Sequence, residues 1–477
     1  HFYLETQSAL AVPVENDGIK IYSSTQSPTG VQKTVAKVLG LIENRVEVDV
    51  RRLGGGFGGK EDQASHWAAL ASLGAYITKK SVKLVLNRNE DIRMTGKRHP
   101  YSYDYKMGID GQGKILAYEA FYYQNAGASA DLSTAILERS LFHGTNSYYI
   151  PNVKITAASC RTNLPPNTAF RGFGAPQAIF VLEYALNRVA EQAGIDIDKL
   201  QKMNLIQDGD RFPYGMALED SKSEVCWNLS NETYRYESLK ADIDRFNQGS
   251  HYIKRGIYRM PVCFGISFTN TILNQAGALV HVYSDGSVNV STGAVEMGQG
   301  VNLKIAQIAS TVFGIPLNKI RVEPTNTSRV ANTSPTAASS GADLNGKASE
   351  IACQSILERL TTFASELLKA TEAEKISIID GWVYRGKKRT ELNWEILVMK
   401  AYLARINLSG QGFYATPDIY FDRSTEKGKP FAYHVFGNAI ISVSVDCLKG
   451  IYTIDGIRII HDVGKSINPK IDRGQIE

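Results

Sequence analysis

The sequence predicts an α+β fold of two mixed lobes, the first at residues 1–250 and the second at residues 251–477. Strand-like and helix-like patterns alternate as far as Leu86, which indicates strands covered by helices. Two adjoining β-like runs then occupy residues 101–123. A polar stretch at about 209–250 is typical of surface structure or of a connector, and it places the expected boundary between the lobes.

The elements of the first lobe follow from local periodicity. Val46, Val48 and Val50 alternate with polar residues, as in a half-buried strand. Extended or strand-like segments are expected at 1–13, 19–22 and 82–86, with a turn at 110–113. Helices are expected at 64–76, around 136–141 and from about 177 to 194.

In the second lobe, new β structure is expected to begin at 265–269, and a hairpin should turn at Ser284-Asp285-Gly286. A helix should follow residue 300, and a long helix should begin at about Ala348. Across both lobes, small-residue loops at 54–61, 170–176, 296–300 and 332–341 each stand directly before a helix. These loops could converge on one ligand, or they could be four unrelated turns.

The composition indicates a folded chain of 477 residues, with 43% hydrophobic residues and a mean hydropathy of -0.20. Such a length can form two or three packed domains. No apolar run approaches the roughly 18 residues of a membrane span, and the mild net charge of +5, with dispersed Lys and Arg, argues against nucleic acid as a partner. The five cysteines are far apart, which favours reduced thiols in the cytoplasm over a disulfide framework, a zinc site or an iron–sulfur cluster.

The glycine-rich loop at 54–61 has the spacing of two phosphate-binding motifs but the chemistry of neither. A dinucleotide fingerprint needs an acidic residue after the next strand, where Asn87-Arg88 stands. A P-loop needs Ser or Thr where Glu61 stands. The loop therefore favours a ligand that packs on Phe57 and tolerates a carboxylate. An equally weighted alternative is a purely structural turn, in which Glu61 and Asp62 complement the helix dipole.

Four motifs occur in a fixed order along the chain. They are Gly-Gly-Gly-Phe-Gly-Gly-Lys-Glu at 54–61, Ala-Phe-Arg-Gly-Phe-Gly at 169–174, Glu-Met-Gly-Gln-Gly at 296–300 and Ser-Pro-Thr-Ala-Ala-Ser at 334–339. Together they resemble the molybdenum-cofactor domain of the xanthine dehydrogenase and aldehyde oxidase family, and the similarity covers essentially the whole chain. The resemblance implies two mixed α/β lobes with a molybdenum–pterin cofactor between them.

The resemblance also implies which residues hold this cofactor. Gln26 would hydrogen-bond an oxo ligand, and Gln26, Phe57, Arg171 and Ala338 would neighbour the molybdenum without ligating it through their side chains. The residues with an implied cofactor-binding role are Gln26, Gly56, Phe57, Arg171, Gly298, Gln299, Ala337, Ala338, Ser339 and Gln475. Each glutamine taken alone would more often be a surface amide, so these roles depend on the motifs.

The substrate implied by the resemblance is a purine. Phe173 and Phe268 would sandwich a flat ring, and Thr269 would add a hydroxyl contact. Glu61 and Arg139 match positions where purine-oxidising members carry an acid and a guanidinium, which can satisfy the two polar edges of a purine. Aldehyde oxidases usually have apolar residues at both places, so xanthine or hypoxanthine is favoured over an aldehyde or another N-heterocycle.

No catalytic residue is identified within the chain. The family's catalytic glutamate lies in a Gly-Glu-Pro-Pro-like motif that this sequence lacks, and it is expected beyond Glu477. The 2Fe-2S and FAD groups would belong to other domains or subunits, in a cytoplasmic homodimer or heteromer that serves purine catabolism, and the chain alone is expected not to turn over. A nucleotide-binding oxidoreductase and a non-catalytic cofactor-binding module are the alternatives from other classes.

Overall fold

The computed structural model describes residues 1–371 and 374–477, and it has a mixed α and β fold, as predicted. The chain forms two compact units, each assembled from three separate segments. Unit 1 comprises His1–Arg98, Pro165–Arg171 and Asn270–Pro417, and unit 2 comprises His99–Leu164, Gly172–Thr269 and Asp418–Glu477. The sequence-based division near residue 250 stays a prediction.

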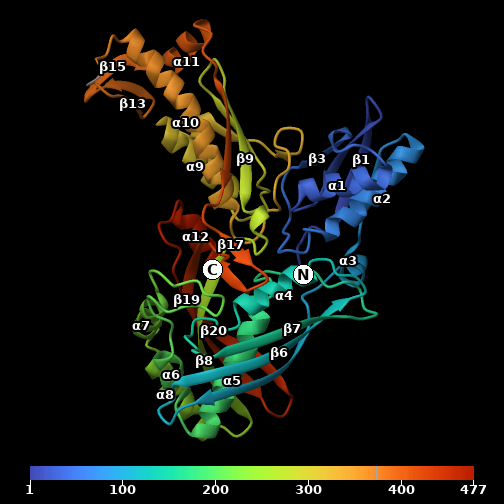
Figure 1. Ribbon diagram of the computed structural model, residues 1–477, viewed down its shortest axis with the longest axis vertical. Coiled ribbons are helices and arrows are strands. Elements are labelled where there is room, and N and C mark those ends of the chain that lie inside the picture. Colours follow the sequence, from blue (N-terminus) through green and yellow to red (C-terminus); the bar gives the residue numbers. More distant parts are fainter. Residues whose placement is uncertain (372–373) are drawn as a thin grey trace. The chain divides into compact units, whose positions relative to one another are not determined.

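The N-terminal part of unit 1 is a sheet in the order β12-β3-β2-β1-β4, on which two helices pack (Figure 1). Its elements are β1 (Ser8–Val14), β2 (Gly18–Ser23), α1 (Pro28–Leu39), β3 (Val46–Val50), α2 (Gln63–Thr78), β4 (Val82–Val85) and β12 (Thr325–Asn326). Val46, Val48 and Val50 are buried, whereas the residues between them are partly exposed. The strands predicted at 19–22, 46–50 and 82–86 and the helix predicted at 64–76 are therefore confirmed.

A second sheet of unit 1 has the order β11-β10-β9-β16, with α9 and α10 beside it (Figure 1). These elements are β9 (Gln275–Val282), β10 (Val288–Thr292), α9 (Val301–Phe313), β11 (Ile320–Val322), α10 (Gly341–Leu367) and β16 (Ser409–Ala415). The helix α10 lies close enough to β16 that a Cβ at Gly412 would be 2.0 Å from the carbonyl oxygen of Ala348. The predicted hairpin is confirmed, and α10 begins at Gly341, earlier than the predicted Ala348.

The rest of unit 1 is a small sheet of β13 (Ile376–Ile379), β14 (Trp382–Arg385) and β15 (Lys388–Asn393), followed by α11 (Trp394–Leu403). A short helix, α3 (Arg88–Met94), follows β4 and begins with a capping box between Asn87 and Glu90. Among residues 1–371 and 374–477, no helix has both the length and the apolar character that a membrane crossing requires.

Among its described residues, unit 2 combines one mixed and one antiparallel sheet with six α-helices and a short strand pair. One sheet, β5-β6-β7, packs against α5, and the other has the order β20-β19-β8 (Figure 1). The elements are β5 (Tyr101–Ile109), β6 (Ile115–Gly127), α4 (Ser133–Phe142), β7 (Val153–Arg161), α5 (Ala175–Ala193), α6 (Ile197–Met203), α7 (Ser223–Tyr234), α8 (Tyr236–Gly249), β8 (Ile253–Ile266), β17 (Tyr420–Asp422), β18 (Lys427–Lys429), β19 (Tyr433–Asp446) and β20 (Ile451–His461). With α12 (Pro469–Ile476), these elements complete the described chain.

Residues 223–249 of the polar stretch predicted at 209–250 form the surface helices α7 and α8. Trp227 and Tyr236 are buried there, and their ring centroids lie 3.8 and 4.0 Å from Cζ of Arg259. One prediction for this region needs correction. The strand expected from residue 265 begins at Ile253 instead. Its first half is polar and exposed, so it lacks the apolar pattern on which the prediction depended.

Candidate cofactor and substrate site

The small-residue loops of unit 1 are in direct contact with one another. The N–H of Leu53 donates to the carbonyl oxygen of Glu296 at 3.0 Å, and the N–H of Val295 donates to the hydroxyl of Thr336 at 2.8 Å. The N–H of Arg171 donates to the carbonyl oxygen of Phe57 at 3.0 Å. These contacts bring together the loops at 54–61, 296–300 and 332–341 and residues 169–171. The loops are therefore not unrelated turns, which was one of the two possibilities left open by the sequence.

Gln26 ties two of these loops together from a buried position, with 2% of its surface exposed. Its Nε2 donates to the carbonyl oxygen of Thr336 at 3.1 Å, and its Oε1 accepts from the N–H of Gly58 at 2.9 Å. Its own main chain bonds to Lys60 and to Thr336. Because an amide nitrogen carries two hydrogens, Gln26 can make a second donation, but a bond to an oxo ligand stays a prediction.

Close packing within the protein explains two glycines of the first loop. A Cβ at Gly58 would lie 2.8 Å from the main chain of Ala169, and Gly58 has a φ of +94°. A Cβ at Gly56 would lie 2.6 Å from Oε1 of Gln26. These glycines are therefore needed for the fold itself. Gly298 differs, because its φ of +105° favours glycine although no atom of the described residues lies within 4 Å of a Cβ placed there.

Strained backbone is concentrated in the same loops. Phe57, Phe173, Ala338 and Ser339 have φ values of 54°, 51°, 55° and 59°, and all four lie in the motifs. Every other non-glycine residue with positive φ in the described chain is Asn, Asp, Lys, Arg or Glu. Left-handed backbone costs about 1–3 kcal/mol at such residues and clusters at ligand sites. Phe57 also keeps 43% of its surface exposed.

The third loop is closed by its own side chains. The carboxylate of Glu296 accepts hydrogen bonds from the N–H groups of Gly298, Gly300 and Asn302 at 2.9 to 3.1 Å, at the start of α9. The amide of Gln299 accepts from Met297 at 2.7 Å and donates to Val295 at 2.8 Å. The predicted contact between Gln299 and a pterin is not tested by these bonds and stays a prediction.

Unit 2 gathers four of the five predicted substrate residues around α4. Arg139 donates to the carbonyl oxygens of Gly265, at 2.7 Å, and of Ser267, which directly precedes the buried Phe268 and Thr269. The hydroxyl of Ser140 donates to Gly174 at 3.1 Å, which holds the loop containing Phe173 against the same helix. The fifth, Glu61, is buried in unit 1, and Gln475 is exposed on α12 in unit 2.

Arg139 is a buried cation for which the described part of the chain supplies no anionic partner. Only 1% of its surface is exposed, and no carboxylate of the described residues forms an ion pair with it. Burial lowers its pKa to about 10, so the guanidinium is still protonated at neutral pH. An uncompensated buried charge is costly, so Arg139 is a candidate for a functional site.

Two comparisons with known proteins decide the family. A model of the molybdopterin cofactor-binding domain matches residues 1–205, and a second model with the same description matches residues 230–477. The chain belongs to the molybdopterin cofactor-binding domain family. It is 42% identical to the xanthine dehydrogenase/oxidase of Mus musculus and 44% identical to the xanthine dehydrogenase of Oryza sativa subsp. japonica, in each case over 100% of this chain.

These matches cover 34% and 33% of the two relatives, so the chain spans about a third of the length of the curated relatives it matches. Among solved structures, the aldehyde oxidoreductase from Desulfovibrio gigas has the same fold, with a TM-score of 0.85. That similarity covers 100% of this chain and 49% of the other, at 24% sequence identity. The predicted family and fold are thus confirmed.

The donor groups on the loops fit a molybdopterin. Such a group presents ring nitrogens, oxygens and a phosphate, which suit main-chain N–H groups at a helix N-terminus. The left-handed Ala338 and Ser339 stand just before α10, whose N-terminus has no side-chain cap at Ser340. No group of three or more His, Cys, Asp or Glu that could hold a metal lies among the described residues. By the family resemblance, the pterin itself would hold the molybdenum.

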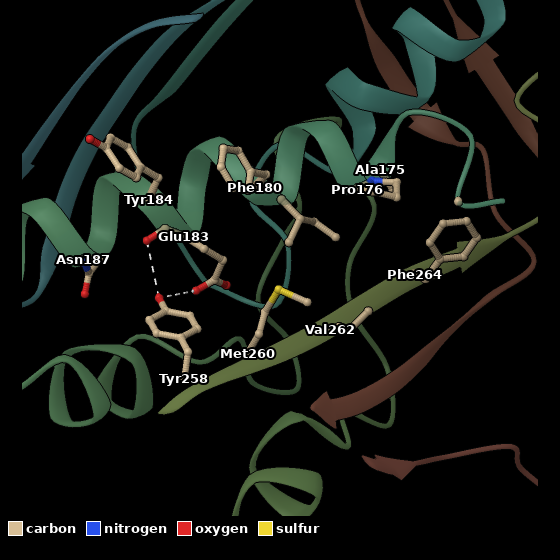
Figure 2. Close-up of a pocket in the computed structure, with 12 residues that line it drawn as sticks. Ala175, Pro176, Phe180, Glu183, Tyr184, Asn187, Tyr258, Met260, Val262 and Phe264 are labelled. Atoms are coloured by element: carbon tan, nitrogen blue, oxygen red, sulfur yellow. Dashed lines mark hydrogen bonds between the residues drawn. The ribbon is translucent and has the colours of Figure 1, made fainter. Parts of the chain in front are cut away.

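A further acidic residue, Glu183, was missed by the sequence analysis. It lines a cavity of about 560 Å³ between α5 and β8, together with Tyr258, Met260 and Phe264 (Figure 2). Its carboxylate accepts hydrogen bonds from Asn146, Tyr148, Gln201 and Tyr258 at 2.9 to 3.2 Å. A carboxyl group among the apolar positions of the helix predicted at 177–194 was the signal that could have revealed it.

Proposed function

We propose that this chain is the molybdopterin-binding part of a xanthine dehydrogenase-like enzyme, which hydroxylates xanthine or hypoxanthine with oxygen from water. The proposal is carried by Arg139, a buried cation that forms no ion pair with the described residues and donates to Ser267, next to Phe268 and Thr269. A purine can accept its hydrogen bonds and share its charge, whereas a simple aldehyde offers one carbonyl oxygen. The identity of 42–44% to xanthine dehydrogenases supports the same substrate class.

When bound, the molybdenum–pterin supplies the oxygen transfer and takes up two electrons. Under this proposal Phe173 and Phe268 bind the flat faces of the purine, and Arg139 stabilises the negative charge that develops on its ring. Glu61 accepts from a ring N–H at the other polar edge. The general base would come from a part of the enzyme outside these 477 residues.

The electrons would leave through iron–sulfur and flavin groups in other domains or subunits. A homodimer or heteromer and a cytoplasmic location also stay predictions from the sequence. An aldehyde or N-heterocycle oxidase is the second candidate, and the shared fold of the aldehyde oxidoreductase from Desulfovibrio gigas favours it. The side chain at Arg139 distinguishes the two candidates.

The test is Arg139→Met in the full-length enzyme loaded with its cofactor. The value of kcat/KM for xanthine should fall by about a hundredfold or more, because loss of one charge-stabilising donor costs about that much. Turnover of a small aldehyde should be retained. Methionine conserves the volume and removes a buried charge, so the fold should survive. Thermal unfolding and molybdenum content would verify this.

Arg423→Met is the matched control, because Arg423 is exposed and pairs with Glu138 of α4 at 3.3 Å. It should leave both activities unchanged. Unaltered xanthine turnover in Arg139→Met would contradict the purine assignment and favour the second candidate.

A further inference from the structure

Arg139 belongs to a closed ring of hydrogen bonds with His143 and Gly265. The guanidinium donates to the carbonyl oxygen of Gly265 at 2.7 Å, and the N–H of Gly265 meets Nε2 of His143 at 3.1 Å. Nδ1 of His143 lies 3.0 Å from the carbonyl oxygen of Arg139. A main-chain N–H can only donate, so Nε2 must accept and Nδ1 must carry the proton. The ring therefore requires the neutral imidazole in one tautomer.

Two aromatic rings hold the guanidinium of Arg139. Its Cζ lies 5.0 Å from the ring centroid of Phe264 and 5.0 Å from that of Phe431. The imidazole of His143 packs on the same two rings, at 4.8 and 5.4 Å. A Cβ at Gly265 would lie 2.4 Å from the ring of Phe431, so only glycine lets that ring contact β8. Aromatic faces attract a cation without neutralising its charge.

The groups around this cluster leave the charge of Arg139 in place. They are Glu138 of α4, which pairs with Arg423 at 3.3 Å, Tyr214, Cys263 of β8 and His434 of β19. Burial, and then the charge of Arg139, lower the pKa of His143 well below its usual value and that of His434 to about 3. Burial raises the pKa of Cys263 and of Tyr214, so both also stay neutral.

We propose that His143 is a positioning residue for substrate binding: as a neutral Nδ1–H imidazole it locks Arg139 between Phe264 and Phe431. Two N–H groups of the guanidinium are used by the main chain of residues 265 and 267. Nε has no hydrogen-bond partner among the described residues, and each terminal nitrogen carries a second hydrogen. A fixed guanidinium keeps these remaining donors and its charge directed at one place, where an electron-rich heterocycle can use them.

The competing explanation is a core histidine that only stabilises the fold. The two explanations differ in what His143→Phe does in the full-length, cofactor-loaded enzyme, since phenylalanine keeps the ring packing but removes both hydrogen bonds. Positioning predicts a loss of about tenfold to a hundredfold in kcat/KM for xanthine, because a displacement of about 1 Å can cost that much. The kcat/KM for a small aldehyde, which does not need Arg139, should change less than about twofold.

His143→Gln should recover part of the xanthine activity, because a glutamine oxygen can accept from Gly265. His281→Phe is the control for loss of a histidine, since His281 lies in unit 1, where its Nδ1 lies 2.9 Å from the hydroxyl of Ser409. Equal losses for xanthine and aldehyde in His143→Phe, or no loss for xanthine, would overturn the proposal.

A second readout does not depend on activity. In the full-length enzyme with ¹⁵N-labelled histidine, the signal that disappears in His143→Gln identifies His143, and its neutral Nδ1–H tautomer should persist from about pH 5.5 to 8.5. A signal that titrates in this range would overturn the positioning role. The inference rests on the proposed function only for the substrate. If the parent enzyme did not turn over xanthine while the tautomer persisted, the proposed function would fail and the fixed Arg139 would stand.

Discussion

Glu183 should make the protein less stable at neutral pH than at mildly acidic pH. Two opposing effects act on its carboxyl group. Burial among apolar groups disfavours the charged form, whereas the four donors Asn146, Tyr148, Gln201 and Tyr258 favour it. Burial is the larger effect and raises the pKa of Glu183 from 4.5 to about 7.

The sign and size of the effect follow from this difference. Between pH 4.5 and about 7 the folded state holds a proton that the unfolded state has lost, so stability falls as the pH rises through this range and is constant above it. One pKa unit corresponds to about 1.4 kcal/mol, so the loss amounts to about 3 kcal/mol. The stabilising contribution is fully present only below the unfolded pKa.

Glu183→Gln isolates this contribution, because it keeps the shape of the side chain and cannot titrate. The free energy of unfolding of both proteins would be measured by urea denaturation at several pH values between about 4.5 and 8. As the pH rises from about 4.5 to 8, the free energy of unfolding of the variant should increase relative to that of the wild type by about 3 kcal/mol. Glu191→Gln on the same helix, at an exposed ion pair with Arg188, should show almost no pH-dependent difference.

The raised pKa of Glu183 is refuted if the difference in free energy of unfolding between wild type and Glu183→Gln does not change with pH, or if the wild type becomes more stable relative to the variant as the pH rises. The first result would mean that the four donors balance the effect of burial, and the second that they outweigh it and lower the pKa of Glu183. Glu183→Leu offers a cross-check, because it leaves those donors without their acceptor and should cost about 3 kcal/mol or more at any pH.

Two further predictions concern the loops of unit 1. Gly58→Ala should lower the free energy of unfolding by at least about 2 kcal/mol, since it adds a contact of 2.8 Å with the main chain of Ala169 to an unfavourable φ. Gly298→Ala, where space is open, should cost only about 1–2 kcal/mol. Equal costs in thermal unfolding would argue against the packing explanation. Phe57→Gly should stabilise the chain by about 1 kcal/mol, because it relieves a φ of 54°, yet it should lower the molybdenum content of the purified enzyme. Unchanged metal content would separate Phe57 from cofactor binding.

Local periodicity was sufficient to predict the strands β2, β3 and β4 and the helix α2 of unit 1. The alternation at Val46, Val48 and Val50 and the alanine-rich α2 directly reflect which faces are buried. Periodicity failed where burial is irregular, as in α7 and α8, whose helices contribute few buried side chains apart from Trp227 and Tyr236. It could not reveal the interleaved units either, because that arrangement depends on contacts between distant segments.

The candidate site shows a similar limit. The motifs predicted which loops form the candidate site, and the structure places loops of unit 1 in contact. The sequence alone did not reveal that Gln26 links two of them through its side-chain amide. His143 and Phe431 carry no motif signal at all. Their importance arises from their contacts with Arg139, and such contacts join residues that lie far apart in the chain.

The structure also changes which residue of the glycine loop is informative. In the sequence, Gly56 and Gly58 belong to a loop with the spacing of phosphate-binding motifs, yet packing against Gln26 and Ala169 is enough to require them. Phe57 has no such explanation, since a large aromatic residue in a left-handed conformation, half exposed, lowers stability without filling the core. The left-handed backbone of Phe57 costs free energy, and a contact with a bound ligand would offset that cost. Arg171, whose N–H donates to the carbonyl oxygen of Phe57, lies beside it. The aromatic residue, and not the glycines around it, is therefore the stronger mark of a ligand at this loop.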